Sequence, residues 1–419
     1  PVSKLAYLIK NQLLSSEDLT KIYLERIKKY DQELNVVVTL TEKLAIKQAQ
    51  KADQEIRSGN YKGALHGIPY GIKDLASYPE YPTTWGAEPY KNQTFNEKAE
   101  VIKKLEKSGA VMLAKLSSGS LARGDIWFGG KTKNPWNLED GSSGSSAGSA
   151  SATSAGLVGF SIGTETLGSI ISPSTKCGVT GLRPTYGSVS TDGFMTLSWS
   201  MDKVGPIARS AKDCAIIFNE IQKTKNLKEV RGEFKKINKN LKIAYLKDLF
   251  LNDTSRFAKN NSNSLELIKN KISNIVPISL PKNYPFEVFD IILRAEAGAF
   301  FDDFLRTHRD SLMVEQGKRS RANSLRQARL IPAVEYIQAN RHRSNLINEI
   351  NLLFENYDII ISPSFGKNQL LISNLTGHPA ISVPNGFDNK NTPTSITFLA
   401  NHYKEDVLLS FVNLIQKET

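Results

Sequence analysis

Cysteine is nearly absent from this 419-residue sequence: the only two are Cys177 and Cys214, and they do not form a C-x-x-C pair. This argues against a disulfide framework or a zinc cluster and favours a reducing compartment. We expect both thiols to be small buried hydrophobic groups.

Long hydrophobic runs are also missing. No stretch of 18 uncharged apolar residues occurs, so we expect no membrane-spanning segment and a cytoplasmic location. The chain begins with Pro1 and not with Met, which leaves room for a targeting segment that was removed.

The composition is that of an ordinary globular protein, with 40% hydrophobic, 23% charged and 9% aromatic residues. Disordered and collagen-like classes are therefore excluded.

The net charge of +12 raises the question of an anionic partner. Its densest runs are residues 223–242, interpreted as a basic connector, and 318–343, where arginines recur at helix-like spacing. Because no RNA-binding module accompanies these runs, we interpret them as solvated surface and do not expect nucleic-acid binding from them.

The hydrophobic pattern alternates between helical and strand-like segments, which predicts an α/β fold. A helix is expected after a cap at Ser15–Asp18, and the others at 41–56, 99–108, 264–275, 286–306 and 405–416. Strands are expected at 66–73, 110–115, 240–246, 358–363 and 379–384. No domain boundary is evident, so we expect one large domain over residues 1–419.

Residues 141–156 are all Gly, Ser, Ala or Thr. A flexible linker would have this composition. However, apolar segments flank the run directly, with Trp136 before it and Leu157–Phe160 after it. We therefore expect a loop and a helix that pack tightly inside the core.

Several familiar catalytic and phosphate motifs are missing. There is no G-x-x-x-x-G-K-[ST] loop and no H-E-x-x-H, and the five histidines have no motif context for a Ser-His-Asp triad. A serine nucleophile would then need another base, for which lysine is the known alternative. The candidates are Lys73, at the end of an apolar strand, Ser145 in the small-residue run, and Ser169. Burial would lower the pKa of such a lysine and make its amine a usable base.

At these residues the chain resembles the amidase signature family. The matching motifs cover nearly the whole chain: His66-Gly-Ile-Pro-Tyr-Gly-Ile-Lys73-Asp74, Ser143-Gly-Ser145-Ser146-Ala-Gly-Ser149-Ala150, Gly163 to Ser169, Cys177 to Gly187, Ser200 to Arg209, Asp358 to Pro363 and Gly377 to Pro384. The resemblance implies a mixed β-sheet covered by helices on both faces, with a signature core at about 61–210.

The resemblance also implies the roles of the site residues. Lys73 would be the general base, Ser145 a bridging serine held by a cis peptide, and Ser169 the nucleophile, 24 residues after Ser145 as in the family. The backbone N–H groups of Thr166, Leu167 and Gly168, together with that of Ser169, would form an oxyanion hole. The substrate would be a small-molecule amide, and neither a metal nor an organic cofactor is implied.

The sequence departs from the family pattern around the nucleophile. Where the family usually has Asp-Thr-Gly-Gly-Ser-Ile-Arg, this chain has Glu165-Thr-Leu167-Gly-Ser169-Ile-Ile171. Leu167 adds a side chain and Ile171 removes an arginine, so we expect an altered pocket wall. The stretch 363–374 is also shorter than in many relatives.

Two functions remain open within the family. A stand-alone amidase would hydrolyse simple amides, whereas the A subunit of a tRNA-dependent amidotransferase releases ammonia from glutamine for a partner subunit. The segment 324–338 lacks the Glu-Val-Lys-Arg-Arg-like stretch of that branch, which favours the stand-alone amidase. Nucleic acid would be a partner only in the amidotransferase alternative, and a homodimer is compatible with the sequence.

Overall fold

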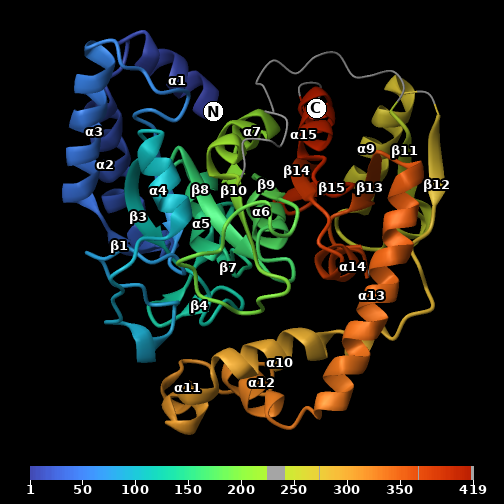
Figure 1. The fold of residues 1–419 in the computed structure, drawn as a ribbon. Coiled ribbons are helices and arrows are strands. Elements are labelled where there is room, and N and C mark those ends of the chain that lie inside the picture. Colours follow the sequence, from blue (N-terminus) through green and yellow to red (C-terminus); the bar gives the residue numbers. More distant parts are fainter. Residues whose placement is uncertain (224–240, 273, 367, 417–419) are drawn as a thin grey trace.

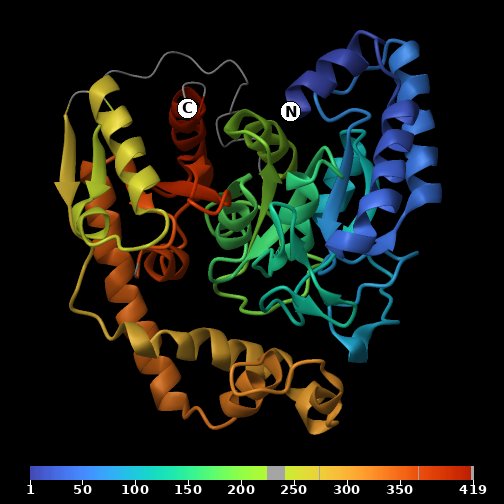
Figure 2. The same cartoon turned by 180° about the vertical axis from the view of Figure 1, so that it is seen from behind.

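The core of the protein is one mixed β-sheet that runs through both halves of the chain (Figures 1 and 2). The computed structural model describes residues 1–223, 241–272, 274–366 and 368–416. Within these residues eleven strands form the sheet, in the order β1 (Val37–Leu40), β3 (Val111–Leu116), β2 (Pro69–Lys73), β8 (Phe160–Glu165), β10 (Lys203–Ala208), β9 (Thr180–Arg183), β14 (Ala380–Phe387), β15 (Pro393–Ala400), β13 (Ile359–Pro363), β11 (Ile243–Leu246) and β12 (Ile275–Ile278). The expected mixed α/β sheet is confirmed.

The direction of three neighbouring strands positions the site. β2 pairs in parallel with both β3 and β8, whereas β10 is antiparallel to β8, with Lys203 opposite Glu165. Because the carboxyl ends of parallel strands meet at the same edge of a sheet, Lys73 at the end of β2 lies beside the turn that follows Glu165.

Helices cover both faces of the sheet, as expected. Ile207 of β10 packs with Ala150 of α5 (Ala147–Ser154) and with the end of α6 (Ile171–Cys177). Val204 and Ala208 belong instead to the cluster with α7 (Ala211–Ile221), against which α15 (Glu405–Gln416) packs. Alternate residues of a strand point to opposite faces, so α5 and α7 lie on opposite sides of the sheet.

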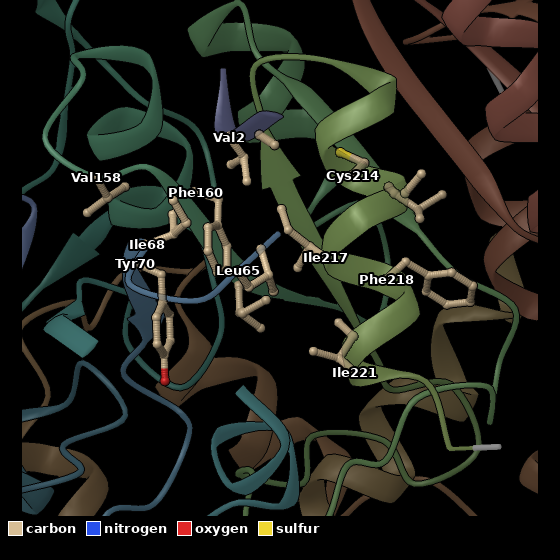
Figure 3. Packing of buried hydrophobic residues seen from close by; sticks show 14 of the residues in the cluster. Val2, Leu65, Ile68, Tyr70, Val158, Phe160, Cys214, Ile217, Phe218 and Ile221 are labelled. Carbon is tan, nitrogen blue, oxygen red and sulfur yellow. The ribbon is translucent and has the colours of Figure 1, made fainter. Parts of the chain in front are cut away.

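The α7 side of the sheet holds a large apolar cluster (Figure 3). Ile217 of α7 points toward Phe160, and the rings of Phe160 and Tyr70 stack with their centroids 5.3 Å apart. Cys214 and Cys177 are both fully buried, which confirms that they serve as small core residues, and burial raises the pKa of each thiol.

The N-terminal helices match the sequence expectation. α1 (Val2–Lys10) precedes α2 (Ser16–Leu34), and the Ser15 hydroxyl accepts the Asp18 N–H at 2.9 Å as a helix cap. α3 (Glu42–Arg57) and α4 (Glu100–Lys107) lie at the expected places. Two short hairpins, β4 (Ile126–Trp127) with β5 (Gly130–Lys131) and β6 (Lys133–Asn134) with β7 (Asn137–Gly141), precede the small-residue run.

The small-residue run is a core segment and not a linker. Its second half forms α5, in which Ala147 to Thr153 are all buried. The hydroxyl of Ser149 donates to the Ile162 carbonyl at 3.0 Å, and the Thr153 and Ser161 hydroxyls lie 2.8 Å apart. Small side chains are therefore required here because the helix lies directly on strand β8.

The C-terminal helices differ from the prediction in three places. The expected helix 264–275 is α9 (Ala258–Lys271), and its predicted end belongs to strand β12 because Ile275–Ile278 pairs with β11. The expected helix 286–306 is broken into a 3₁₀ turn at Phe286–Val288, α10 (Asp290–Phe300) and α11 (Asp302–Arg306). The basic stretch is divided at Pro332 into α12 (Arg321–Ala328) and α13 (Ala333–Asn356), since proline begins a helix but does not continue one.

Helices α10, α11 and α12 gather at one end of the molecule, and α13 runs from them back to the sheet (Figure 1). The remaining helices are the short α8 (Lys247–Leu251) and α14 (Gln369–Leu375). Residues 224–240 of the predicted basic connector lie outside the described residues. None of the described helices is both long enough and apolar enough to cross a bilayer.

Candidate active site

Lys73 is enclosed by hydroxyl groups at the carboxyl edge of the sheet. Its Nζ lies 2.8 Å from Ser145 Oγ, 2.9 Å from Thr164 Oγ1 and 3.2 Å from Ser146 Oγ. The side chain has no solvent exposure, and no carboxylate forms a salt bridge with it among the described residues. The partners of this amine are therefore neutral.

This environment favours the uncharged amine. Burial lowers the pKa of Lys73 well below its usual value, and the carboxylates of Asp202 and Glu165 offset this only in part. A neutral amine has a lone pair that can accept a proton, so the site meets the chief requirement for a lysine base.

Ser145 lies in the loop before α5, and its peptide bond to Gly144 is cis. A Cβ atom at Gly144 would lie 1.8 Å from the Gly124 carbonyl oxygen, so only glycine fits there. The chain around Ser145 therefore runs directly against the neighbouring 124–125 loop, which holds the serine toward Lys73.

Ser169 lies in the turn between β8 and α6. Its carbonyl accepts the Ser146 N–H at 3.1 Å, which joins the turn to the residue next to Ser145. The Ser169 side chain is partly exposed, and its hydroxyl has no hydrogen-bond partner in the described part of the chain. The three residues selected from the sequence thus gather at one edge of the sheet, with Lys73 in direct contact with Ser145.

The turn before Ser169 presents a row of free N–H groups. Within the described ranges, those of Thr166, Leu167, Gly168 and Ser169 have no hydrogen-bond acceptor. Gly168 has φ of +93°, and a Cβ atom there would lie 2.8 Å from Leu370 Cδ2, so the turn requires glycine at this position. Unpaired backbone donors beside a serine hydroxyl are the arrangement that an oxyanion hole needs.

The two unusual residues of this turn have different surroundings. Leu167 is partly buried and packs between the apolar clusters around Trp85 and around Ile171. Ile171 itself is fully buried in the second cluster, with Met201 and Ala380. Ile171 is therefore a core residue, and an altered pocket wall at Leu167 stays a prediction.

Several residues at this site have no role predicted from the sequence. Ser146 and Thr164 contact Lys73, and the Thr166 hydroxyl donates to Asp202 Oδ1 at 2.6 Å. Asp202 lies in a motif noted in the sequence, but its contact with the turn depends on the pairing of β10 with β8.

The prediction that the basic stretch 318–343 is solvated surface is wrong for Arg321. It is 4% exposed, and its Nε and Nη2 donate to the carbonyls of Leu121 and Ala122 at 3.0 and 3.2 Å, while Nη1 has no partner in the described structure. Burial lowers the pKa of its guanidinium to about 9. Ala122 also lines a cavity of about 80 Å³ together with Thr166 and Asp202, so Arg321 bonds to a residue in the wall of the cavity beside the turn.

In the described residues, no group of three or more His, Cys, Asp or Glu side chains is arranged to hold a metal ion. The groups that the structure brings together at this edge of the sheet are a lysine amine, serine and threonine hydroxyls, and backbone N–H groups.

Comparison with known proteins identifies relatives along the entire chain. A family model described as Amidase matches residues 18–373. The A subunit of the glutamyl-tRNA(Gln) amidotransferase of Acinetobacter baumannii is 31% identical over 471 aligned positions, which cover 100% of this chain and 96% of the relative. The protein of the same name from Thermoanaerobacter pseudethanolicus is 28% identical, and the alignment covers 98% of this chain and 94% of the relative.

Solved structures give the same result for the fold. The native peptide amidase from Stenotrophomonas maltophilia has a TM-score of 0.86 at 25% identity, covering 100% of this chain and 96% of the other. An amidase family protein from Bacillus anthracis has a TM-score of 0.88 at 25% identity, with 100% and 90% covered.

Proposed function

Because this chain belongs to the amidase family, we propose that it is a serine amidohydrolase that cleaves the C–N bond of a carboxylic amide through an acyl-enzyme on Ser169. The observation that carries the proposal is the 2.8 Å contact between Lys73 Nζ and Ser145 Oγ in a fully buried, neutral environment. In this proposal the amine is the general base and the serine transmits the proton.

The reaction begins with attack of Ser169 Oγ on the amide carbonyl carbon. As the new C–O bond forms, the Ser169 proton passes to Ser145 Oγ, and the Ser145 proton passes to Lys73 Nζ. The carbonyl oxygen becomes an oxyanion, and the free N–H groups of residues 166–169 are its donors.

The second half returns the proton. The Lys73 ammonium protonates the leaving nitrogen through Ser145, the C–N bond breaks, and an amine or ammonia departs. Water then attacks the acyl ester by the same relay, which releases the carboxylic acid and restores Ser169.

The test is a panel of simple amides, with glutamine included, assayed with the purified chain alone. Ser169→Ala should abolish turnover, while Ser58→Ala, a change at an exposed helix end, should not affect it. Turnover by Ser169→Ala equal to that of the unchanged protein would overturn the proposal.

The second candidate is the glutaminase component, the A subunit, of a tRNA-dependent amidotransferase. Two observations favour it: the relatives that bear that name cover the full chain, and Arg321, which bonds to Ala122 in the wall of the cavity beside the turn, has an unpaired Nη1. A guanidinium is the group that pairs best with a substrate carboxylate such as that of glutamine. This candidate predicts a glutaminase activity that requires a partner protein and that falls in Arg321→Lys. Hydrolysis of simple amides without any partner supports the stand-alone amidase.

A further inference from the structure

A buried carboxylate holds the chain immediately after the proposed nucleophile. Glu165 Oε2 accepts the N–H groups of Ile170 at 2.7 Å and of Ile171 at 2.9 Å. Glu165 is the last residue of β8, so its side chain reaches across the turn and joins its two ends. The shape of the turn, and with it the direction of the N–H groups of residues 166–169, depends on this carboxylate.

The other oxygen of Glu165 is held from two distant parts of the chain. Arg183 Nη1 donates to Oε1 at 3.0 Å and Asn374 Nδ2 donates to it at 2.8 Å. Arg183 Nη2 also donates to the His378 carbonyl at 2.8 Å. The guanidinium therefore fixes the carboxylate to β9 and to the segment that leads into β14.

The charge of Glu165 depends on this pairing. The side chains of Glu165 and Arg183 are both fully buried. Burial alone would raise the pKa of Glu165, but the Arg183 guanidinium, the Ile171 N–H and the Asn374 amide hold it below its usual value. Two buried lysines also act on Glu165 through space, but neither bonds to it. The Nζ of Lys203 donates to the Met201 carbonyl, and burial lowers the pKa of its amine to about 7. Burial lowers the pKa of Lys73 well below its usual value, and its partners are hydroxyl groups. Ile171 supplies no charge, so Arg183 is the direct counter-charge of the carboxylate.

We propose that Arg183 is a positioning residue for catalysis, which acts through Glu165 to hold the oxyanion-hole turn in its reactive shape. This rests on the proposed function, in which Ser169 is the nucleophile. Arg183 does not touch the reacting atoms in this account. Removal of Arg183 should reduce kcat more than it changes KM. The direction of the turn N–H groups affects stabilisation of the oxyanion more strongly than it affects substrate binding.

The test is a double-mutant cycle of Arg183→Met and Glu165→Gln, assayed on an amide that the unchanged protein hydrolyses. In the Glu165 background, Arg183→Met should lower kcat at least tenfold with KM within threefold, because it leaves a buried carboxylate without a cation. In the Glu165→Gln background the same change should cost less than threefold, since the neutral amide needs no counter-charge. An equal loss in both backgrounds would overturn the proposal, as would an unchanged kcat in Arg183→Met.

A pH profile separates positioning from a merely structural role. In Arg183→Met the pKa of Glu165 should rise, so kcat should show an additional fall at acid pH as this carboxylate is protonated. The double variant with Glu165→Gln and Arg183→Met has no carboxylate at this position and should lack this fall. A loss of activity that is the same at every pH would overturn the proposal. Arg341→Met, at an exposed arginine of α13, is the matched control.

Two further variants keep the outcome interpretable. If Arg183→Met does not fold, Arg183→Lys replaces it in the test. Because one amine cannot reproduce both guanidinium hydrogen bonds, kcat should fall three- to thirtyfold with KM preserved. An unchanged kcat in Arg183→Lys would overturn the proposal. Full activity of Ser169→Ala would instead refute the proposed function itself, whatever the Arg183 variants show.

Discussion

Lys73 Nζ and Ser145 Oγ lie 2.8 Å apart at the edge of the sheet, and the lysine side chain is fully buried. Lys73 ends strand β2, whereas Ser145 belongs to a loop 72 residues later. The fold brings them together because α5, which follows Ser145, lies on β8 next to β2. The proposed proton relay from Ser169 to Lys73 depends on this contact.

Lys73→Met should lower kcat about 10²- to 10⁴-fold, the usual contribution of a general base. Methionine keeps the apolar stem in the core, so folding should be preserved. Steady-state kinetics together with a thermal melt check both points, and Lys91→Met at an exposed lysine is the control. A folded Lys73→Met protein with full activity would refute the lysine base.

The lowered pKa of Lys73 predicts how activity and stability change with pH. Activity should rise with pH as the amine loses its proton, and the midpoint should lie well below the ordinary lysine value. The folded state binds fewer protons here than the unfolded state, so stability should also rise with pH from that midpoint up to about 10.4. Lys73→Met should remove this rise, which chemical denaturation at several pH values can measure. An identical pH dependence of stability in both proteins would contradict the assignment.

Ser145 and Ser146 both contact Lys73, but only Ser145 is assigned to the relay. Ser145→Ala should lower kcat about 10²-fold or more. Ser146→Ala should lower it less than tenfold and should instead cost about 1 kcal/mol of stability, because its hydroxyl is bonded to the backbone of Thr164. Parallel kinetics and urea unfolding of the two variants would show this contrast, and a larger kcat loss in Ser146→Ala would exchange the two roles.

Gly168→Ala tests the turn that presents the N–H groups. Its φ of +93° and the closeness of Leu370 both oppose a side chain, so the turn must shift. Displacing oxyanion donors should lower kcat about 10²- to 10³-fold with a smaller change in KM. Gly187→Ala, where φ is also positive but the surrounding space is open, is the control for backbone strain. Similar kinetic losses in both variants would argue against a specific role of this turn.

The fold class could be predicted from the sequence, and candidate site residues could be named, because both depend on local signals. Short apolar runs predicted strands β2, β3, β11, β13 and β14, and the apolar flanks of residues 141–156 indicated that this run belongs to the core. Lys73, Ser145 and Ser169 could be selected as candidates from the segments that contain them, and the family resemblance implied the role of each.

What escaped prediction depends on contacts between distant segments. Thr164 reaches Lys73 only through the parallel pairing of β8 with β2, and Arg183 reaches Glu165 only through the position of β9 beside β10. The burial of Arg321 could not be predicted either, since its partners are carbonyls of residues 121 and 122, about 200 positions earlier in the chain. Strand β12 was missed because its pattern, with Val276 and Pro277 exposed, is that of an edge strand.

The most direct test of the central claim is mass spectrometry of the protein quenched during turnover of an amide from the panel. A mass increase equal to that of the acyl group should appear on the peptide that contains Ser169 and should be absent in Ser169→Ala. In Lys73→Met this adduct should form much more slowly. Turnover with the adduct on another residue, or undiminished turnover in Ser169→Ala, would show that Ser169 is not the nucleophile.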